Sequence, residues 1–261
     1  MSRSRPLLAA YDVEVLKLRR SRVVLVTTVA LLVLPGALAL AFLAAADRGG
    51  GDAMSVKASA LVVGEGWTGY LDGLTQIFAT GGLLGMGVVV AWCFAREFSD
   101  RTVVSLYASA TPREAVVAAK FAVLAGWAAL LSVALGPVAL LIGIAGGLGL
   151  PSSADIDAVL RLVVLGVLTA LLALATGLFA SVGRGPLPAF GGLIGLIVAA
   201  QVAVVAGVGG WFPWSAPGLW AVATSTSGLD PVPGWQLGVV PLSALLVVLA
   251  TLAWWRHAEL T

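Results

Sequence analysis

Charged and metal-binding side chains are scarce in this sequence. Only 11% of its 261 residues are charged, whereas a soluble domain carries about 25%. A single cysteine, Cys93, excludes a disulfide framework within the chain and a multi-cysteine metal site. The single histidine, His257, excludes a His-Glu-x-x-His zinc site, and its place near the C-terminus offers no Ser-His-Asp arrangement within the apolar segments. We therefore expect no metal site.

The sequence also lacks the motif of a nucleotide hydrolase. None of its three lysines follows a glycine, so there is no Gly-x-x-x-x-Gly-Lys-Ser/Thr phosphate loop. We expect no enzyme activity in this chain, which is not predicted to hydrolyse ATP by itself. The apolar segments also place no acidic residue securely near mid-membrane, where a proton-driven or sodium-driven carrier would need one. This favours an apolar path for a hydrophobic or amphipathic molecule.

Apolar residues are abundant instead. They make up 60% of the chain, and the mean hydropathy is +1.03, so lipid must be the solvent for much of the surface. A helix needs roughly 20 apolar residues to cross a bilayer core of about 30 Å. The sequence predicts an all-α, polytopic membrane protein with a tail at 1–22, a six-helix domain at 23–255 and a tail at 256–261. The predicted spans are 23–46, 74–95, 115–145, 158–182, 187–208 and 237–255. We expect the first of them to stay as a signal anchor, without a cleavable signal peptide.

The basic residues predict the orientation. Twelve of the fifteen fall in the tails and in the loops that follow spans two and four. The other three fall on the opposite side, and they are Arg48, Lys57 and Arg161. Because cytoplasmic loops are rich in lysine and arginine, both termini are predicted to be cytoplasmic.

Residues 6–21 predict an amphipathic helix before the first span. At 100° per residue its apolar face contains Leu7, Leu8, Tyr11, Val15 and Leu18. Such a helix would lie in the cytoplasmic interface with its basic residues among anionic headgroups. The alternative is a plain positively charged anchor.

The loop before the last span is rich in tryptophan and proline. Its notable residues are Trp211, Pro213, Trp214, Pro217 and Trp220. We expect residues 211–235 either to dip into the outer leaflet or to form an aromatic belt at the headgroups.

A few polar side chains fall within the predicted spans. Gln201 lies near the middle of the fifth span, and Thr169 and Thr176 lie in the fourth. These three residues either line a translocation path or form hydrogen bonds between helices.

The loop at 96–120 predicts an extra helix outside the membrane. Asp100 is suited to cap a short helix that ends near Ala108. Thr111 would cap the next helix, with Pro112 at its first position and Glu114 completing a capping box. Because membrane insertion does not require such an element, it is a candidate contact for a cytoplasmic protein.

This loop resembles type-two ATP-binding-cassette (ABC) exporter permeases. Their pattern has a glutamate after span two, an acidic-x-threonine step, a proline–arginine pair and a lysine entering span three. The matching residues here are Glu97, Asp100-Arg101-Thr102, Pro112-Arg113 and Lys120. The N-terminal Glu14, Lys17, Arg19 and Arg20 are similar to the same family, especially its antibiotic-export and bacteriocin-immunity members.

The resemblance implies that residues 100–109 form a coupling helix seated in a separate cytoplasmic ATPase, which would bind ATP and Mg. The implied coupling residues are Glu97, Asp100, Arg101, Thr102, Leu106, Tyr107, Pro112 and Arg113. For Glu97 and Arg101 a local ion pair is the alternative. The implied interfacial-helix residues are Tyr11, Glu14, Lys17, Arg19 and Arg20. The further implied partners are a second permease, identical or related, and membrane lipid, but no nucleic acid.

The resemblance also implies a location and an activity. The chain would lie in a bacterial plasma membrane and export a hydrophobic or amphipathic substrate, such as an antibiotic or a peptide. Two alternatives remain at this point: a stand-alone carrier or channel, and a membrane scaffold without transport activity.

Overall fold

The computed structural model describes residues 4–48, 64–99, 112–222 and 232–258. Over these ranges the chain is helical and contains no strand. Six of its helical segments are long and apolar enough to cross a membrane. The prediction of an all-α, multi-pass membrane protein with six spanning helices is therefore confirmed.

The helices differ in places from the predicted spans. The fourth span consists of two helices that are interrupted at Leu174, and the second starts before position 74 because Trp67, Tyr70 and Leu71 are buried in the bundle. The elements are α1 (Ser4–Arg19), α2 (Arg22–Asp47), α4 (Gly66–Ser99), α6 (Arg113–Ala145), α7 (Ser153–Ala173), α8 (Ala175–Val182), α9 (Pro186–Val205), α10 (Ala216–Val222), the 3-10 helix η1 (Gly234–Gly238) and α11 (Val239–His257).

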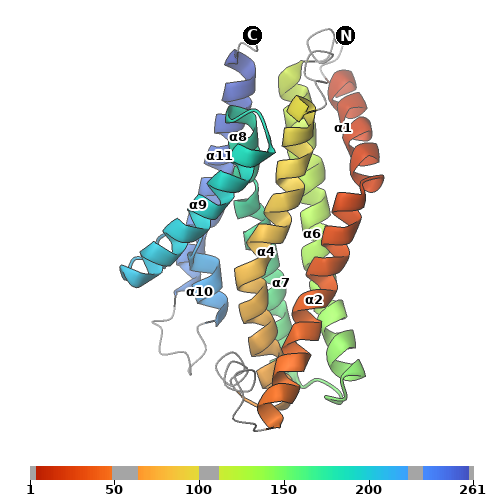
Figure 1. The fold of residues 1–261 in the computed structure, drawn as a ribbon, viewed down its shortest axis with the longest axis vertical. Coiled ribbons are helices and arrows are strands. Elements are labelled where there is room, and N and C mark those ends of the chain that lie inside the picture. Colours follow the sequence, from red (N-terminus) through yellow and green to blue (C-terminus); the bar gives the residue numbers. More distant parts are fainter. Residues whose placement is uncertain (1–3, 49–63, 100–111, 223–231, 259–261) are drawn as a thin grey trace.

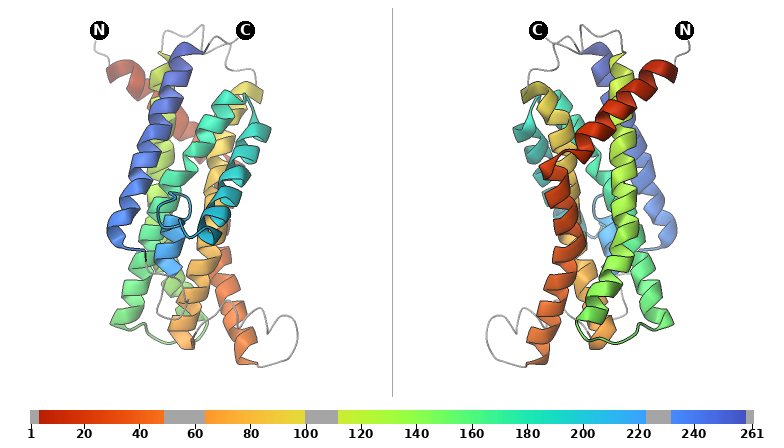
Figure 2. Two further views of the ribbon diagram at one scale, coloured as in Figure 1. Left: turned by 90° about the vertical axis from the view of Figure 1, so that its left-hand side faces the viewer. Right: turned by 90° about the vertical axis from the view of Figure 1, so that its right-hand side faces the viewer.

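Both termini lie at one end of the bundle, where α4 and α11 finish and α6 begins (Figure 1). We call this end the terminal end. The helix α4 packs against α2, α7, α8 and α9, and α6 packs against α1, α2 and α7. The helix α1 crosses α6 obliquely near the terminal end (Figure 2).

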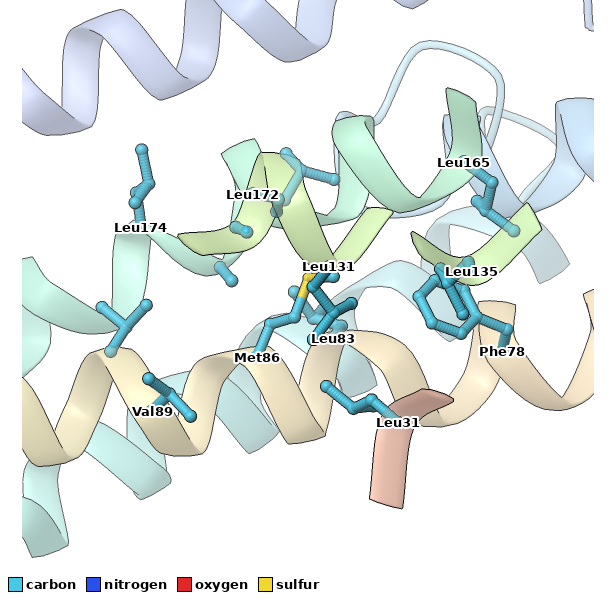
Figure 3. Close-up of a cluster of buried hydrophobic side chains, with 14 of the residues drawn as sticks. Leu31, Phe78, Leu83, Met86, Val89, Leu131, Leu135, Leu165, Leu172 and Leu174 are labelled. Atoms are coloured by element: carbon cyan, nitrogen blue, oxygen red, sulfur yellow. The ribbon is translucent and has the colours of Figure 1, made fainter. Parts of the chain in front are cut away.

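The core is built around α4. Phe78, Met86 and Val89 of this helix are fully buried. They lie in a cluster that also contains Leu131 of α6 and Leu165 of α7 (Figure 3). Because lipid tails are as apolar as these side chains, close packing is what holds such helices together within a membrane.

Gly143 of α6 shows how close this packing is. A Cβ atom at this position would overlap the ring of Trp67, whereas a Cβ at Gly126 of the same helix would meet no atom within 4 Å. Gly143→Ala should therefore cost about 1–3 kcal/mol through overpacking. Gly126→Ala should instead stabilise the helix by about 0.5–1 kcal/mol. Thermal unfolding of the purified variants in detergent measures both, and a Gly143→Ala chain as stable as Gly126→Ala would contradict this packing.

The interruption at Leu174 occurs without proline or glycine at that position. The Leu174 N–H donates to the Leu171 carbonyl at 3.3 Å, and the Gly177 N–H donates to the Leu174 carbonyl at 3.0 Å. These bonds span three residues and not four, so the chain is locally wound more tightly than an α-helix. The segment after α9 contains α10, which packs against α4 and α7 and lies short of the bundle end that α2 and α6 reach (Figure 1).

Candidate functional site

Four charged side chains from three helices meet near the terminal end. We call Glu14, Lys17, Glu97 and Lys120 the ion cluster. The Lys120 Nζ lies 2.8 Å from Glu14 Oε2 and 2.8 Å from Glu97 Oε1. The Lys17 Nζ lies 2.8 Å from Glu14 Oε1 and 3.0 Å from Glu97 Oε1. Each ammonium therefore bridges both carboxylates, and the cluster joins α1, α4 and α6.

Burial makes this cluster unusual for a group of charges. The side chains of Lys120 and Glu97 are only 1% and 3% exposed. Lys120 also donates to the Cys93 carbonyl at 3.3 Å, so all three of its N–H groups have acceptors. Two positive and two negative charges cancel, which is the condition under which buried charges are tolerated.

Lys17 is the most exposed member, at 32%. Burial alone would lower the pKa of its ammonium, but the hydrogen bonds and charges of Glu14 and Glu97 outweigh that effect and raise the pKa. The stabilisation from Lys17 is thus complete below its unfolded-state pKa and is lost only as the pH rises through the raised value. Lys17 therefore remains charged at neutral pH.

The ion cluster brackets the segment that connects α4 to α6. Glu97 lies in the last turn of α4, and Lys120 lies in the second turn of α6. A force on residues 100–111 would therefore reach α4 and α6 together, and through Glu14 and Lys17 it would also reach α1. The ion pairs thus link the three helices at this end.

The last helix is tied to the same end. Arg256 of α11 donates to both carboxylate oxygens of Glu114 in α6, each at 2.7 Å. The Trp255 indole donates to Ser181 Oγ of α8 at 2.9 Å. Its ring also packs against Phe98 of α4 with centroids 5.7 Å apart. The last helix is therefore joined to α4, α6 and α8 at the terminal end.

A second feature is a cavity of about 250 Å³ between α4, α7, α9 and the segment that contains α10. We call it the α4–α9 cavity. Two residues singled out from the sequence as path candidates, Thr169 and Gln201, line it together. Its lining residues are Gln76, Ala79, Thr80, Leu83, Leu165, Thr169, Leu172, Ala200, Gln201, Val204, Trp214, Ser215, Pro217, Gly218, Leu219 and Val222.

Some polar groups of the cavity wall are used internally. The Ser215 hydroxyl donates to the Gly209 carbonyl at 2.7 Å, and the Thr80 hydroxyl donates to the Gln76 carbonyl at 2.9 Å. The Trp214 indole donates to the Leu172 carbonyl at 3.4 Å. That carbonyl lies beside the interruption at Leu174, where regular α-helical bonding stops.

Only some of the expected coupling residues lie within the described part of the chain. Glu97 lies inside the ion cluster, an environment that the sequence did not predict, because its partners come from distant helices. Pro112 is exposed just before α6, and Arg113 Nη1 donates to the Ala258 carbonyl at 3.4 Å. The remaining residues of that set lie outside the described residues: Asp100, Arg101, Thr102, Leu106 and Tyr107. Their coupling role stays a prediction.

The residues expected on the N-terminal helix lie on α1, except Arg20, which follows its last residue. Tyr11, Arg19 and Arg20 are exposed, whereas Glu14 is buried against the bundle. The residues of the predicted apolar face differ in burial: Leu8 and Tyr11 are exposed, whereas Val15 and Leu18 are partly buried. The side chain of Leu7 is not among those that the structure describes. Location at the membrane interface stays a prediction.

The other expected residues separate into two groups. Trp214 and Pro217 line the α4–α9 cavity, together with Gln76 and Ser215, which sequence reasoning missed. Thr176 is fully buried away from that lining, and its hydroxyl has no hydrogen-bond partner among the described residues.

Of the tryptophans in this segment, Trp214 lines the cavity, whereas Trp211, Trp220 and Trp235 do not. Trp211 is exposed and packs edge-on against Trp235 with centroids 5.3 Å apart. Pro213 and Trp220 are partly buried.

These features define a multi-pass membrane protein whose helices are linked by charges at one end. The sequence profile of the family described as "ABC-2 family transporter protein" matches residues 11–200, which is more than half of the chain. The chain belongs to this family, and it is an ABC-2 type permease, as the sequence predicted. Comparison with curated proteins and with solved structures found no match.

Proposed function

We propose that this chain is the membrane subunit of an ATP-driven exporter and that a separate ATPase subunit supplies the energy. The observation that carries the proposal is the ion cluster, which joins α1, α4 and α6 on both sides of the segment at 100–111. An ATPase that moved this segment would move three helices as one body. Family membership supports a permease of this kind.

The orientation is part of the proposal. The terminal end, which carries both termini, would face the cytoplasm. The concentration of lysine and arginine in the tails and in the loops after spans two and four supports this orientation. ATP and Mg would be bound by the partner ATPase, and a second permease, identical or related, would complete the transporter. The proposed location is a bacterial plasma membrane.

The positions of the buried carboxylates bear on the energy source and, through it, on the kind of substrate. The buried carboxylates of the ion cluster, Glu14 and Glu97, are paired with lysines near the terminal end and not placed at mid-span. This supports energy supply by ATP over ion coupling. We propose export of a hydrophobic or amphipathic substrate, with antibiotics and peptides as the first candidates.

Purification from the native membrane in mild detergent tests the class. We expect a nucleotide-binding ATPase subunit to co-purify in fixed proportion, identified by mass spectrometry. Recovery of the chain without an ATPase at every detergent strength would favour a stand-alone carrier or channel.

A proline in the expected coupling helix tests the mechanism. Ser105→Pro should leave membrane insertion intact but abolish ATP-driven export, because proline within a helix costs about 3 kcal/mol. The measurements are the amount of inserted chain, ATP hydrolysis and substrate export by the complex. Ser105→Ala is the matched control and should behave like the wild type. Normal export by a correctly inserted Ser105→Pro chain would refute the coupling role of residues 100–109.

A further inference from the structure

We propose that the α4–α9 cavity binds the uncharged, hydrogen-bonding headgroup of an amphiphile, such as a polyol or an amide. The inference rests on the proposed function, since the headgroup would belong to the exported molecule, but the binding itself can be tested on this chain alone. Three observations support it: the lack of charged residues among the described residues of the lining, the polar side chains in its wall that form no internal hydrogen bond, and its size.

The described residues that line the cavity include no aspartate, glutamate, lysine, arginine or histidine. A charged headgroup entering the cavity would lose hydration without gaining a counter-charge, and burial of an unpaired charge is far more costly than burial of an amide or a hydroxyl. The lining therefore favours a neutral group.

Three polar side chains in the wall remain available to a ligand. Gln76 of α4, Thr169 of α7 and Gln201 of α9 line the cavity, and their side chains form no hydrogen bond with the described part of the chain. Thr169 is only 5% exposed. Lipid tails cannot satisfy such groups, so water or a ligand must. Two amides and a hydroxyl supply both donors and acceptors, which suits a group carrying several hydroxyls or an amide.

The other polar side chains of the wall are already hydrogen-bonded within the chain, so Gln76, Thr169 and Gln201 are the ones that we assign to ligand binding. Ser215, Thr80 and Trp214 already donate to backbone carbonyls and so shape the wall. The volume, about 250 Å³, lies just below the range of about 300–1,000 Å³ for pockets that hold drug-sized ligands. It suits a headgroup better than a whole amphiphile. Apolar neighbours such as Leu83 and Val204 adjoin the polar groups and suit the start of an alkyl chain.

A competition experiment on the full chain in lipid nanodiscs tests the inference. The probe is decanoyl-N-methylglucamide with a photoreactive diazirine in its tail, and the competitors are unlabelled decanoyl-N-methylglucamide, decyl phosphate and decyltrimethylammonium. We expect the probe to label peptides that contain residues 76–83 or 200–204. The neutral competitor should displace it at a concentration at least about tenfold lower than either charged one, which is about 1.4 kcal/mol of discrimination.

Variants of Gln76 and Gln201 test whether these two side chains bind the headgroup. Gln76→Leu and Gln201→Leu should each weaken displacement by the neutral competitor by about two- to tenfold, the range expected for one lost hydrogen bond. Gln236→Leu is the matched control, because this glutamine lies on η1 and does not line the cavity. It should behave like the wild type.

Equal displacement by the charged amphiphiles, labelling elsewhere in the chain, or wild-type behaviour of both glutamine variants would overturn the inference. If a variant fails to fold, the competition series on the wild-type chain still decides. The two proposals fail separately. Selective binding of the neutral amphiphile without a co-purifying ATPase would refute the proposed ATP-driven export and support the headgroup site. A co-purifying ATPase together with unselective binding would refute the headgroup site and support ATP-driven export.

Discussion

Replacing Lys120 with methionine should destabilise the chain by about 3–5 kcal/mol, the range measured when one partner of a buried ion pair is removed. Lys120 is 1% exposed and donates to both Glu14 and Glu97. Without it, two buried carboxylates would share the single ammonium of Lys17, and the Cys93 carbonyl would lose its hydrogen bond. Because small proteins have a total stability of about 5–15 kcal/mol, this is a large fraction.

The measurement is unfolding of the purified chain in detergent, by heat or by titration with sodium dodecyl sulfate. The matched control is Arg256→Met, which removes a cation whose pair with Glu114 is exposed and should change stability little. The double variant Lys120→Met with Glu97→Gln leaves the pair of Glu14 and Lys17 with balanced charges. It should therefore recover part of the lost stability. A single variant as stable as the wild type would show that the ion cluster does not hold the three helices together.

Truncating Trp255 should have the second largest effect. This side chain is buried at the meeting point of α4, α8 and α11, where it contacts Phe98 and donates to Ser181. Replacing a buried aromatic residue with alanine costs about 3–5 kcal/mol in soluble proteins. We expect about 3 kcal/mol here, because lipid solvates apolar groups and leaves mainly the cavity and lost packing as the cost.

Two further variants separate the causes. Trp235→Ala is the matched control, because this tryptophan is 67% exposed, and it should cost much less. Trp255→Phe keeps most of the ring but loses the hydrogen bond to Ser181, which still donates to the Gly177 carbonyl. It should cost about 1 kcal/mol. The same unfolding assay measures all three variants, and equal losses for Trp255→Ala and Trp235→Ala would contradict the buried role of Trp255.

Hydropathy was sufficient to predict the six spanning helices, because each apolar run is long enough to need lipid. It could not predict the interruption at Leu174, since residues 170–175 are all apolar and contain neither proline nor glycine. The early start of α4 was also missed. Its first turns, with Trp67 and Tyr70, are polar enough to look like a loop but are buried by α6.

The candidate sites were only partly accessible from sequence. Glu97 and Lys120 were singled out by a family pattern, but their contact with Glu14 and Lys17 depends on how α1 crosses α6. The spacing of Glu14 and Lys17, three residues apart on one helix, was the available signal for a local pair. It carried no information about the two distant partners.

Polarity within an apolar span singled out Thr169, Thr176 and Gln201, of which Thr169 and Gln201 line the cavity and Thr176 does not. Gln76 was missed because it fell at the edge of its predicted span. Ser215 was missed because its place depends on how the segment after α9 folds back against α4 and α7.

The interruption at Leu174 has a mechanical consequence. The helix before it, α7, packs on α4 and α6, whereas α8 after it packs on α9, α4 and α11. Because the bonds at Leu174 already depart from the α-helical pattern, bending there breaks no regular helical bond. Bending at Leu174 would turn α8, and with it the α9 wall that contains Gln201, relative to the α7 wall that contains Thr169. It would thereby change the spacing of the polar groups that a bound headgroup would bridge.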